Sequence, residues 1–264
     1  MASEILNNVL IAKNLSIGYP SKKGDTIIAE GLHFELKKGE LIGLVGSNGI
    51  GKSTLLRTLS ATQLPLNGSI ILNGSDISEN TSLQRATQLS LVLTEAPASK
   101  NLTVLELISL GRQPHTSWMG TLTPLDLTKI EEAIEATDLV ELQNKNCYEL
   151  SDGQLQRVYI ARALAQDTPI IILDEPTTHL DLYHRAYILK LLKKLAVEKQ
   201  KTILFSTHEI DIAIQLADTM MVMTVNNLAI GSPCKLIEKG KFDALFPPET
   251  IHFDKTTGRF SVKD

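Results

Sequence analysis

The chain has 264 residues, which is enough for one or two domains with a substantial buried core. Hydrophobic residues make up 43% and charged residues 21%, close to average globular usage, so the composition excludes a mostly disordered, collagen-like or coiled-coil protein. A formal net charge of −4 gives no electrostatic footprint for nucleic acid as a principal ligand, and we expect no nucleic-acid partner.

The pattern of apolar residues predicts an α/β fold. Short strands are expected between Leu10 and Phe34, around a polar turn at residues 20–25, and Ser69–Leu72 with Asn73-Gly74 continues this antiparallel β subdomain. Other short apolar runs alternate with helical patterns, which is typical of a mostly parallel sheet buried on both faces. These runs are Leu41–Val45, Leu89–Leu93, Ile170–Leu173, Ile203–Phe205 and Met220–Val225.

From about residue 100 to 165 helical patterns dominate. They cover Val104–Leu110, Leu127–Ala136 and Gln154–Ala165, with few strand candidates between them. We therefore expect an α-helical subdomain inserted into the α/β core.

The first apolar run leads into a glycine-rich loop that fits G-x-x-x-x-G-K-[ST] and opens a helix at Leu55–Ser60. Such a loop directs backbone N–H groups and a helix N-terminus at phosphate oxygens. Lys52 is expected to reach the β and γ phosphates, and Ser53 to offer its hydroxyl to Mg²⁺. The alternative is a glycine-rich turn with a solvated lysine. The predicted nucleotide contacts are Gly46, Ser47, Asn48, Gly49, Ile50, Gly51, Lys52, Ser53 and Thr54.

Two polar strand ends are expected at the same edge of the sheet, where α/β proteins bind ligands. Ile170–Leu173 ends in Asp174 and Glu175, which we assign to the metal and to the attacking water, respectively. A second strand ends in His208, whose imidazole is expected near the γ-phosphate. The alternatives are acids that merely end a strand and a structural histidine.

The segment Leu150–Arg157 reads LSDGQLQR. With the phosphate loop, the Asp-Glu strand, Thr178–Asp181 and His208 in this order, the sequence resembles the ATP-binding subunits of ABC transporters over nearly its whole length. The resemblance implies one ABC ATPase domain with a P-loop NTPase (RecA-like) core. Residues 1–94 and 166–264 would form the core with its β subdomain, and residues 95–165 the helical subdomain that carries the signature.

The resemblance also implies a homodimer with two composite sites, each holding ATP and Mg²⁺. The signature residues Ser151, Asp152, Gly153 and Gln154 would contact the ATP bound by the opposite protomer. Asp181 would connect the two sites across the dimer. Asp152 departs from the glycine that the family more often has there, which makes Ser151 and Gly153 the firmer matches.

Tyr19 and Glu95 are two further positions of the family pattern. Tyr19 matches the aromatic residue that stacks on adenine, and the alternative is local packing of a turn tyrosine. Glu95 stands where the family usually has a glutamine that reaches Mg²⁺. A carboxylate is also a hard oxygen ligand, so we expect metal contact with altered metal dependence. The alternative is a solvated loop acid.

Residues 102–120 contain Leu107-Ile108-Ser109-Leu110-Gly111-Arg112-Gln113-Pro114-His115, which is similar to a segment of ATPases serving iron-siderophore, haem and cobalamin importers. The implied function is ATP hydrolysis that powers uptake through membrane permease subunits, with a substrate-binding protein acting indirectly. The implied location is the cytoplasmic face of the membrane. A permease helix would dock between the Glu95 loop and the helical subdomain, near Leu102 and Leu105. The alternative is a segment that simply packs.

Features of the whole chain agree with a protein that is neither exported nor membrane-spanning. Cys147 and Cys234 are too few for a disulfide framework, and an acid, Glu4, stands where a secretory signal needs a basic residue. The longest aliphatic stretches are strand-sized. Two other functions remain alternatives: a soluble ABC ATPase acting as a nucleotide-dependent clamp, and a P-loop kinase for a small molecule.

Overall fold

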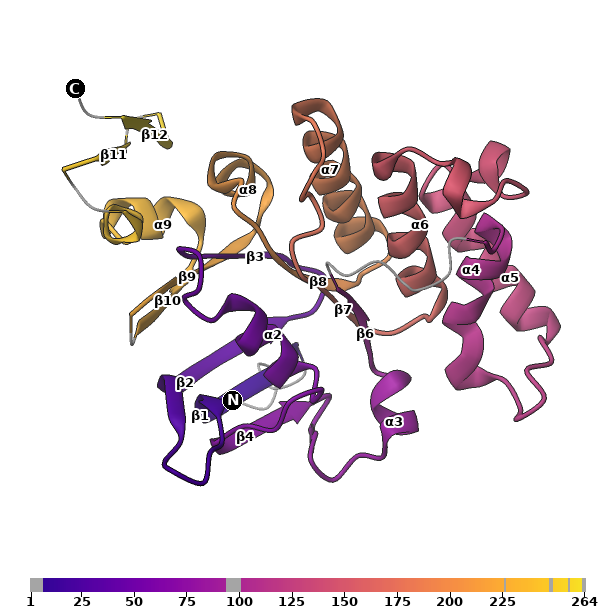
Figure 1. The fold of residues 1–264 in the computed structure, drawn as a ribbon, viewed down its shortest axis with the longest axis horizontal. Coiled ribbons are helices and arrows are strands. Elements are labelled where there is room, and N and C mark those ends of the chain that lie inside the picture. The colour runs from indigo at the N-terminus through magenta and orange to yellow at the C-terminus, as the bar shows by residue number, and fades with distance from the viewer. Residues whose placement is uncertain (1–6, 94–100, 226, 247–248, 256, 263–264) are drawn as a thin grey trace.

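The six-stranded sheet at the centre of the molecule has the strand order β10-β9-β3-β8-β7-β6 (Figure 1). This computed structural model describes residues 7–93, 101–225, 227–246, 249–255 and 257–262. All neighbouring pairs are parallel except β9 and β10, and β6 lies at an edge. The strands are β3 (Leu41–Val45), β6 (Leu89–Val92), β7 (Ile170–Leu173), β8 (Thr202–Ser206), β9 (Thr219–Thr224) and β10 (Asn227–Gly231).

Alternate side chains of these strands enter two separate cores because successive residues of a strand point to opposite faces. Ile171 and Leu173 pack with helices α6 (Asp152–Ala165), α7 (Leu182–Glu198) and α8 (Ile210–Leu216). Ile170 and Ile172 pack with helix α2 (Lys52–Leu59) and the β subdomain. Helices α2 and α6 therefore lie on opposite faces of the sheet.

The β subdomain is a four-stranded antiparallel sheet with the order β2-β1-β4-β5. Its strands are β1 (Asn8–Tyr19), β2 (Thr26–Lys37), β4 (Asn67–Leu72) and β5 (Ser75–Asp76), followed by the short helix α3 (Ser82–Ala86). These observations confirm the predicted α/β fold with an antiparallel β subdomain.

The helices between β6 and β7 pack mainly on one another and on the face of the sheet that α6 covers (Figure 1). They are α4 (Val104–Ser109), α5 (Pro124–Ala136) and α6, with 3₁₀ turns η1 (Leu110–His115), η2 (Val140–Leu142) and η3 (Cys147–Glu149). Thr103, Thr123 and Ser151 each begin an α-helix with a capping box, which satisfies N–H groups of the first turn. Helix α4 ends one residue earlier than predicted and continues as η1.

After β10 the chain forms helix α9 (Pro233–Glu238), the turn η4 (Asp243–Leu245) and a hairpin of β11 (Ile251–Asp254) and β12 (Arg259–Val262). Phe253 in the hairpin stacks on Phe242, with the ring centroids 5.2 Å apart. Among the helices of the described residues, none combines the length and apolar character needed to cross a bilayer.

Candidate functional site

The loop between β3 and α2 follows a path that requires glycine at particular positions. Gly51 has a φ of 112°, and a Cβ there would lie 2.3 Å from Cγ2 of Ile28. A Cβ on Gly46 would lie 2.7 Å from the carbonyl oxygen of Met223. The loop therefore packs so closely between β2 and β9 that no side chain fits at these two positions. Its backbone then turns into the N-terminus of α2. This is the strand, loop and helix arrangement that a phosphate cradle needs.

Lys52 lies inside this loop, with only 5% of its surface exposed. Its Nζ donates hydrogen bonds to the carbonyl oxygens of Gly46 and Ser47, at 3.0 and 3.3 Å. Burial lowers the pKa of Lys52, against the opposing effect of the carboxylates of Glu175 and Asp174. Lys52 begins α2 after the carboxyl end of β3, and both acids follow the carboxyl end of β7, with the parallel strand β8 between these two strands.

The end of β7 is tied to the end of β8 through one hydroxyl. Asp174 is 6% exposed, and the Ser206 hydroxyl donates a hydrogen bond to its Oδ1 at 2.7 Å. The same Ser206 oxygen accepts the backbone N–H of Glu175 at 2.8 Å. Glu175 has a φ of 50°, in the left-handed region that side chains other than glycine rarely adopt. Ser206 therefore holds both acids, and with them a strained backbone turn.

The carboxylate of Glu175 faces His208. Oε1 of Glu175 lies 2.6 Å from Nε2 of His208, and Oε2 accepts a hydrogen bond from the Thr178 hydroxyl at 3.1 Å. Glu175 is partly exposed and His208 exposed, so solvent reaches the pair. A carboxylate in this setting can accept a proton from a water molecule, and the imidazole can orient it. Lys52, Asp174, Glu175 and His208 thus gather at the carboxyl edge of the sheet.

The signature segment forms the start of α6. Ser151 is the N-cap, and its Oγ accepts the backbone N–H of Gln154 at 3.3 Å. The Gln154 side chain accepts the N–H of Ser151 in return, at 3.0 Å, while Asp152 occupies the first helical position. Helix α6 and helix α2 lie on opposite faces of the sheet. Within one chain, the signature is therefore separated from the phosphate loop that precedes α2.

Three further predicted site residues have separate surroundings. Asp181 is the N-cap of α7, where its Oδ1 accepts the backbone N–H of His184 at 2.8 Å. Tyr19, 48% exposed, lies beside the phosphate loop, and its hydroxyl shares a 3.0 Å hydrogen bond with the Thr54 hydroxyl. Glu95 lies outside the described residues.

Sequence reasoning missed the residues that hold the predicted ones in place. Ser206, Thr178 and His184 each bind a predicted site residue. Ser206 and Thr178 belong to polar segments, at a strand end and after the two acids, and that position is the only signal the sequence offers for them.

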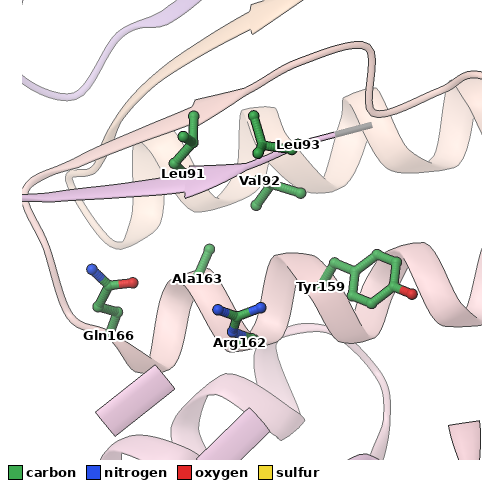
Figure 2. A pocket seen from close by; sticks show the side chains of 7 residues that line it. All are labelled: Leu91, Val92, Leu93, Tyr159, Arg162, Ala163 and Gln166. Atoms are coloured by element: carbon green, nitrogen blue, oxygen red, sulfur yellow. The ribbon is translucent and has the colours of Figure 1, made fainter. Parts of the chain in front are cut away.

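A pocket of about 210 Å³ runs between the edge strand β6 and helix α6. Figure 2 shows Val92 pointing from the strand toward the helix that carries Tyr159 and Arg162, whereas Leu91 and Leu93, which also line the pocket, point to the other side of the strand. Its other lining residues are Ala163 and Gln166. Neither Leu102 nor Leu105, near which docking of a permease helix is predicted, lines this pocket.

The Gly-Arg-x-Pro-His segment has a structural role. Arg112 is buried and its Nε donates to Oδ1 of Asp126 at 2.8 Å, while its Nη1 donates to the carbonyl oxygen of Ala165 at 2.7 Å. His115 Nε2 lies 2.9 Å from the carbonyl oxygen of Gln166. Arg112 thereby joins η1 to α5 and α6. Trp118, later in the same segment of residues 102–120, is 94% exposed and does not pack.

Comparison with known proteins identifies the fold and its relatives. The sequence profile of the ABC transporter family matches residues 29–178. An uncharacterized ABC transporter ATP-binding protein of Methanocaldococcus jannaschii is 35% identical and covers 97% of this chain and 87% of the relative. The iron(3+)-hydroxamate import ATP-binding protein FhuC of Bacillus subtilis is 40% identical, over 82% of this chain and 79% of that protein.

A solved structure gives the same result. It is a dimeric, post-hydrolysis state of an ATP-binding cassette bound to ADP and phosphate, with a TM-score of 0.72 and 27% identity. The match covers 85% of this chain and 98% of that one. These similarities do not favour the soluble clamp or the small-molecule kinase.

Proposed function

The chain belongs to the ABC transporter family, and we propose that it is the ATPase subunit of an importer for an iron chelate, haem or cobalamin. ABC ATP-binding proteins are ATPases, so its reaction is ATP hydrolysis coupled to transport, in the translocase class. The cargo class is supported by the name of the FhuC relative.

The observation that carries the proposal is the convergence of Lys52, Asp174, Glu175 and His208 at the carboxyl ends of the parallel strands β3, β7 and β8. Lys52 and the loop glycines would bind the phosphates of ATP, and Tyr19 would stack on adenine. Glu175 would accept the proton of the attacking water, with His208 orienting its carboxylate. Catalysis of phosphoryl transfer is mainly positioning and charge neutralisation, which this set of groups can supply.

The donor set fits Mg²⁺, which prefers oxygen ligands. The hydroxyl of Ser53 and the carboxylate of Asp174 are such ligands, and Glu95 would add a third. The hydrogen bond from Ser206 leaves Asp174 in a defined orientation. When bound, the ion would neutralise charge on the phosphate oxygens.

The complete site would be composite. The opposite placement of α2 and α6 supports a homodimer in which the signature of one protomer, Ser151 to Gln154, meets the ATP held by the other. Asp181 would connect the two sites. ATP buried between two protomers stabilises the closed pair, because the ligand binds that state and not the separated one. Residues 95–165 would form the helical unit that moves with the signature.

Membrane permease subunits would dock in the pocket between β6 and α6, which would place the chain at the cytoplasmic face of the membrane. A substrate-binding protein would act on it only through the permease. The apolar Val92 on the strand and the polar Tyr159 and Arg162 on the helix suit an amphipathic helix (Figure 2). We expect Leu93→Glu to abolish permease-stimulated ATPase while the basal rate persists, with Leu64→Glu, also exposed, as the control. Unchanged stimulation in Leu93→Glu would move the interface elsewhere.

The central experiment is Glu175→Gln. This variant should bind ATP with normal affinity, release almost no phosphate and accumulate as an ATP-bound dimer, because the amide cannot accept the proton of the attacking water. Glu135→Gln makes the same change at an exposed helix position and should behave as wild type. Phosphate release and light scattering give the two readouts. A near-normal hydrolysis rate would remove Glu175 from its role.

A further inference from the structure

His184, in the first turn of α7, contacts Asp181 through both its backbone and its side chain. Its backbone N–H donates to Oδ1 of Asp181 at 2.8 Å, and its Nδ1 lies 2.9 Å from each carboxylate oxygen. These hydrogen bonds, the backbone bond first, lower the pKa of Asp181. An ionised carboxylate only accepts hydrogen bonds, so Nδ1 of His184 carries the proton.

The opposite edge of the same imidazole lies against the signature. A Cβ on Gly153 would lie 2.6 Å from Cδ2 of His184, 3.1 Å from Cγ and 3.3 Å from Nε2. Real Cβ atoms do not approach so closely, so the start of α6 can rest here only because residue 153 has no side chain. The absence of a side chain at Gly153 thus has a reason within one chain, apart from any approach to nucleotide.

Two tyrosines of α7 add contacts, one to the His184 ring and one to helix α6. The Tyr183 ring meets the His184 ring edge-on, with the centroids 5.3 Å apart. One turn later, the Tyr187 hydroxyl donates to Asp138 at 2.5 Å, and the guanidinium of Arg157, from α6, lies 5.6 Å from the centre of its ring. The same side of α7 therefore contacts α6 at two levels, and His184 makes the contact closest to the signature.

We propose that His184 is a positioning residue that couples Asp181 to the signature turn. Its imidazole sets the spacing between the starts of α6 and α7. A displacement of Asp181 therefore moves Gly153, and a displacement of Gly153 moves Asp181. This inference rests on the proposed function, because it gives the composite site an internal connection between two of its parts. It adds His184 to the residues that determine whether a bound ATP is hydrolysed.

The first test separates nucleotide binding from turnover. His184→Ala should leave the affinity of the protomer for a fluorescent ATP analogue within about twofold, since the phosphate loop is untouched. The kcat for hydrolysis should fall about tenfold, and ATP-driven dimerisation, measured by light scattering in the Glu175→Gln background, should weaken. His33→Ala, at an exposed strand position, should change none of these values. Losses of affinity and turnover in parallel, together with a lower melting temperature, would reduce His184 to a structural role and overturn the proposal.

The second test is a double-mutant cycle. Gly153→Ala should lower kcat strongly because the new methyl group displaces the imidazole. In Gly153→Ala/His184→Ala the methyl group has room, so the double variant should be several-fold more active than Gly153→Ala alone. Losses that simply multiply would show that the contact does not matter and would overturn the proposal. A wild-type protein that neither hydrolyses ATP nor dimerises with it would instead refute the proposed function.

Discussion

Ser206 is the residue on which the geometry of both acids depends, and Ser206→Ala removes that support without touching either acid. The hydroxyl is fully buried, donates to Asp174 and accepts the N–H of Glu175. A hydrogen bond to a charged group contributes about 1.5–3 kcal/mol, and a buried donor left unpaired costs about 1–3 kcal/mol. These ranges give a loss of unfolding free energy of about 3 kcal/mol.

The effect on turnover follows from backbone strain. The left-handed conformation of Glu175, with its φ of 50°, costs about 1–2 kcal/mol relative to an ordinary one. In Ser206→Ala the N–H of Glu175 loses its partner. Leaving the left-handed conformation then lowers the free energy of this residue, and its carboxylate no longer points at His208. A shift of about 1.4 kcal/mol toward the relaxed form is a tenfold decrease in the competent population, so kcat should fall about tenfold.

The matched control is Ser90→Ala. Ser90 is also a buried serine at a strand of the same sheet, but its hydroxyl bonds to Thr168 and to the carbonyl oxygen of Ile170, away from the acids. We expect both variants to lose stability in urea unfolding, and only Ser206→Ala to lose phosphate release at saturating ATP. Equal kcat values for the two variants would refute the argument that Ser206 holds the catalytic geometry.

Two further predictions concern stability and nucleotide affinity. Hydrogen bonds from Thr123 and the charge of Arg112 lower the pKa of Asp126 from 3.8 to about 2. A depressed carboxyl pKa stabilises the fold above pH 3.8, and the effect is lost as the pH falls from there toward 2. The shift corresponds to about 2 kcal/mol of unfolding free energy, which Asp126→Asn should lose. The unfolding free energy of the variant should therefore depend less on pH between about 4 and 2, and an unchanged pH dependence would contradict this. Tyr19→Ala should weaken ATP binding by about fivefold and leave triphosphate binding unchanged, because stacking contributes about 1 kcal/mol, whereas Tyr19→Phe should bind ATP normally in calorimetry. Equal affinities of the alanine variant and wild type would favour simple packing.

The sheet could be predicted well from the sequence because a buried parallel strand is a local signal. Leu41–Val45 and Ile170–Leu173 match the observed strands residue for residue. The prediction of where α4 ends was less accurate. The chain continues there into a 3₁₀ turn that contains Pro114, and the hydrophobic periodicity does not distinguish an α-helix from a 3₁₀ turn. The type of an element can therefore be predicted from nearby residues, whereas its exact ends also depend on how it packs against other elements.

The candidate site divides in the same way. The glycines of the loop and the acids after Leu173 are visible because their chemistry and their position at a strand end coincide. Ser206 and His184 are not, since their roles arise from partners on other elements: Ser206 bonds to Glu175, 31 residues away in sequence, and His184 lies against Gly153. A serine at a strand end and a histidine in the first turn of a helix have many ordinary explanations. Their roles depend on the fold, which brings β7 beside β8 and α6 beside α7. Only then do Ser206 and His184 contact residues that the sequence had already identified.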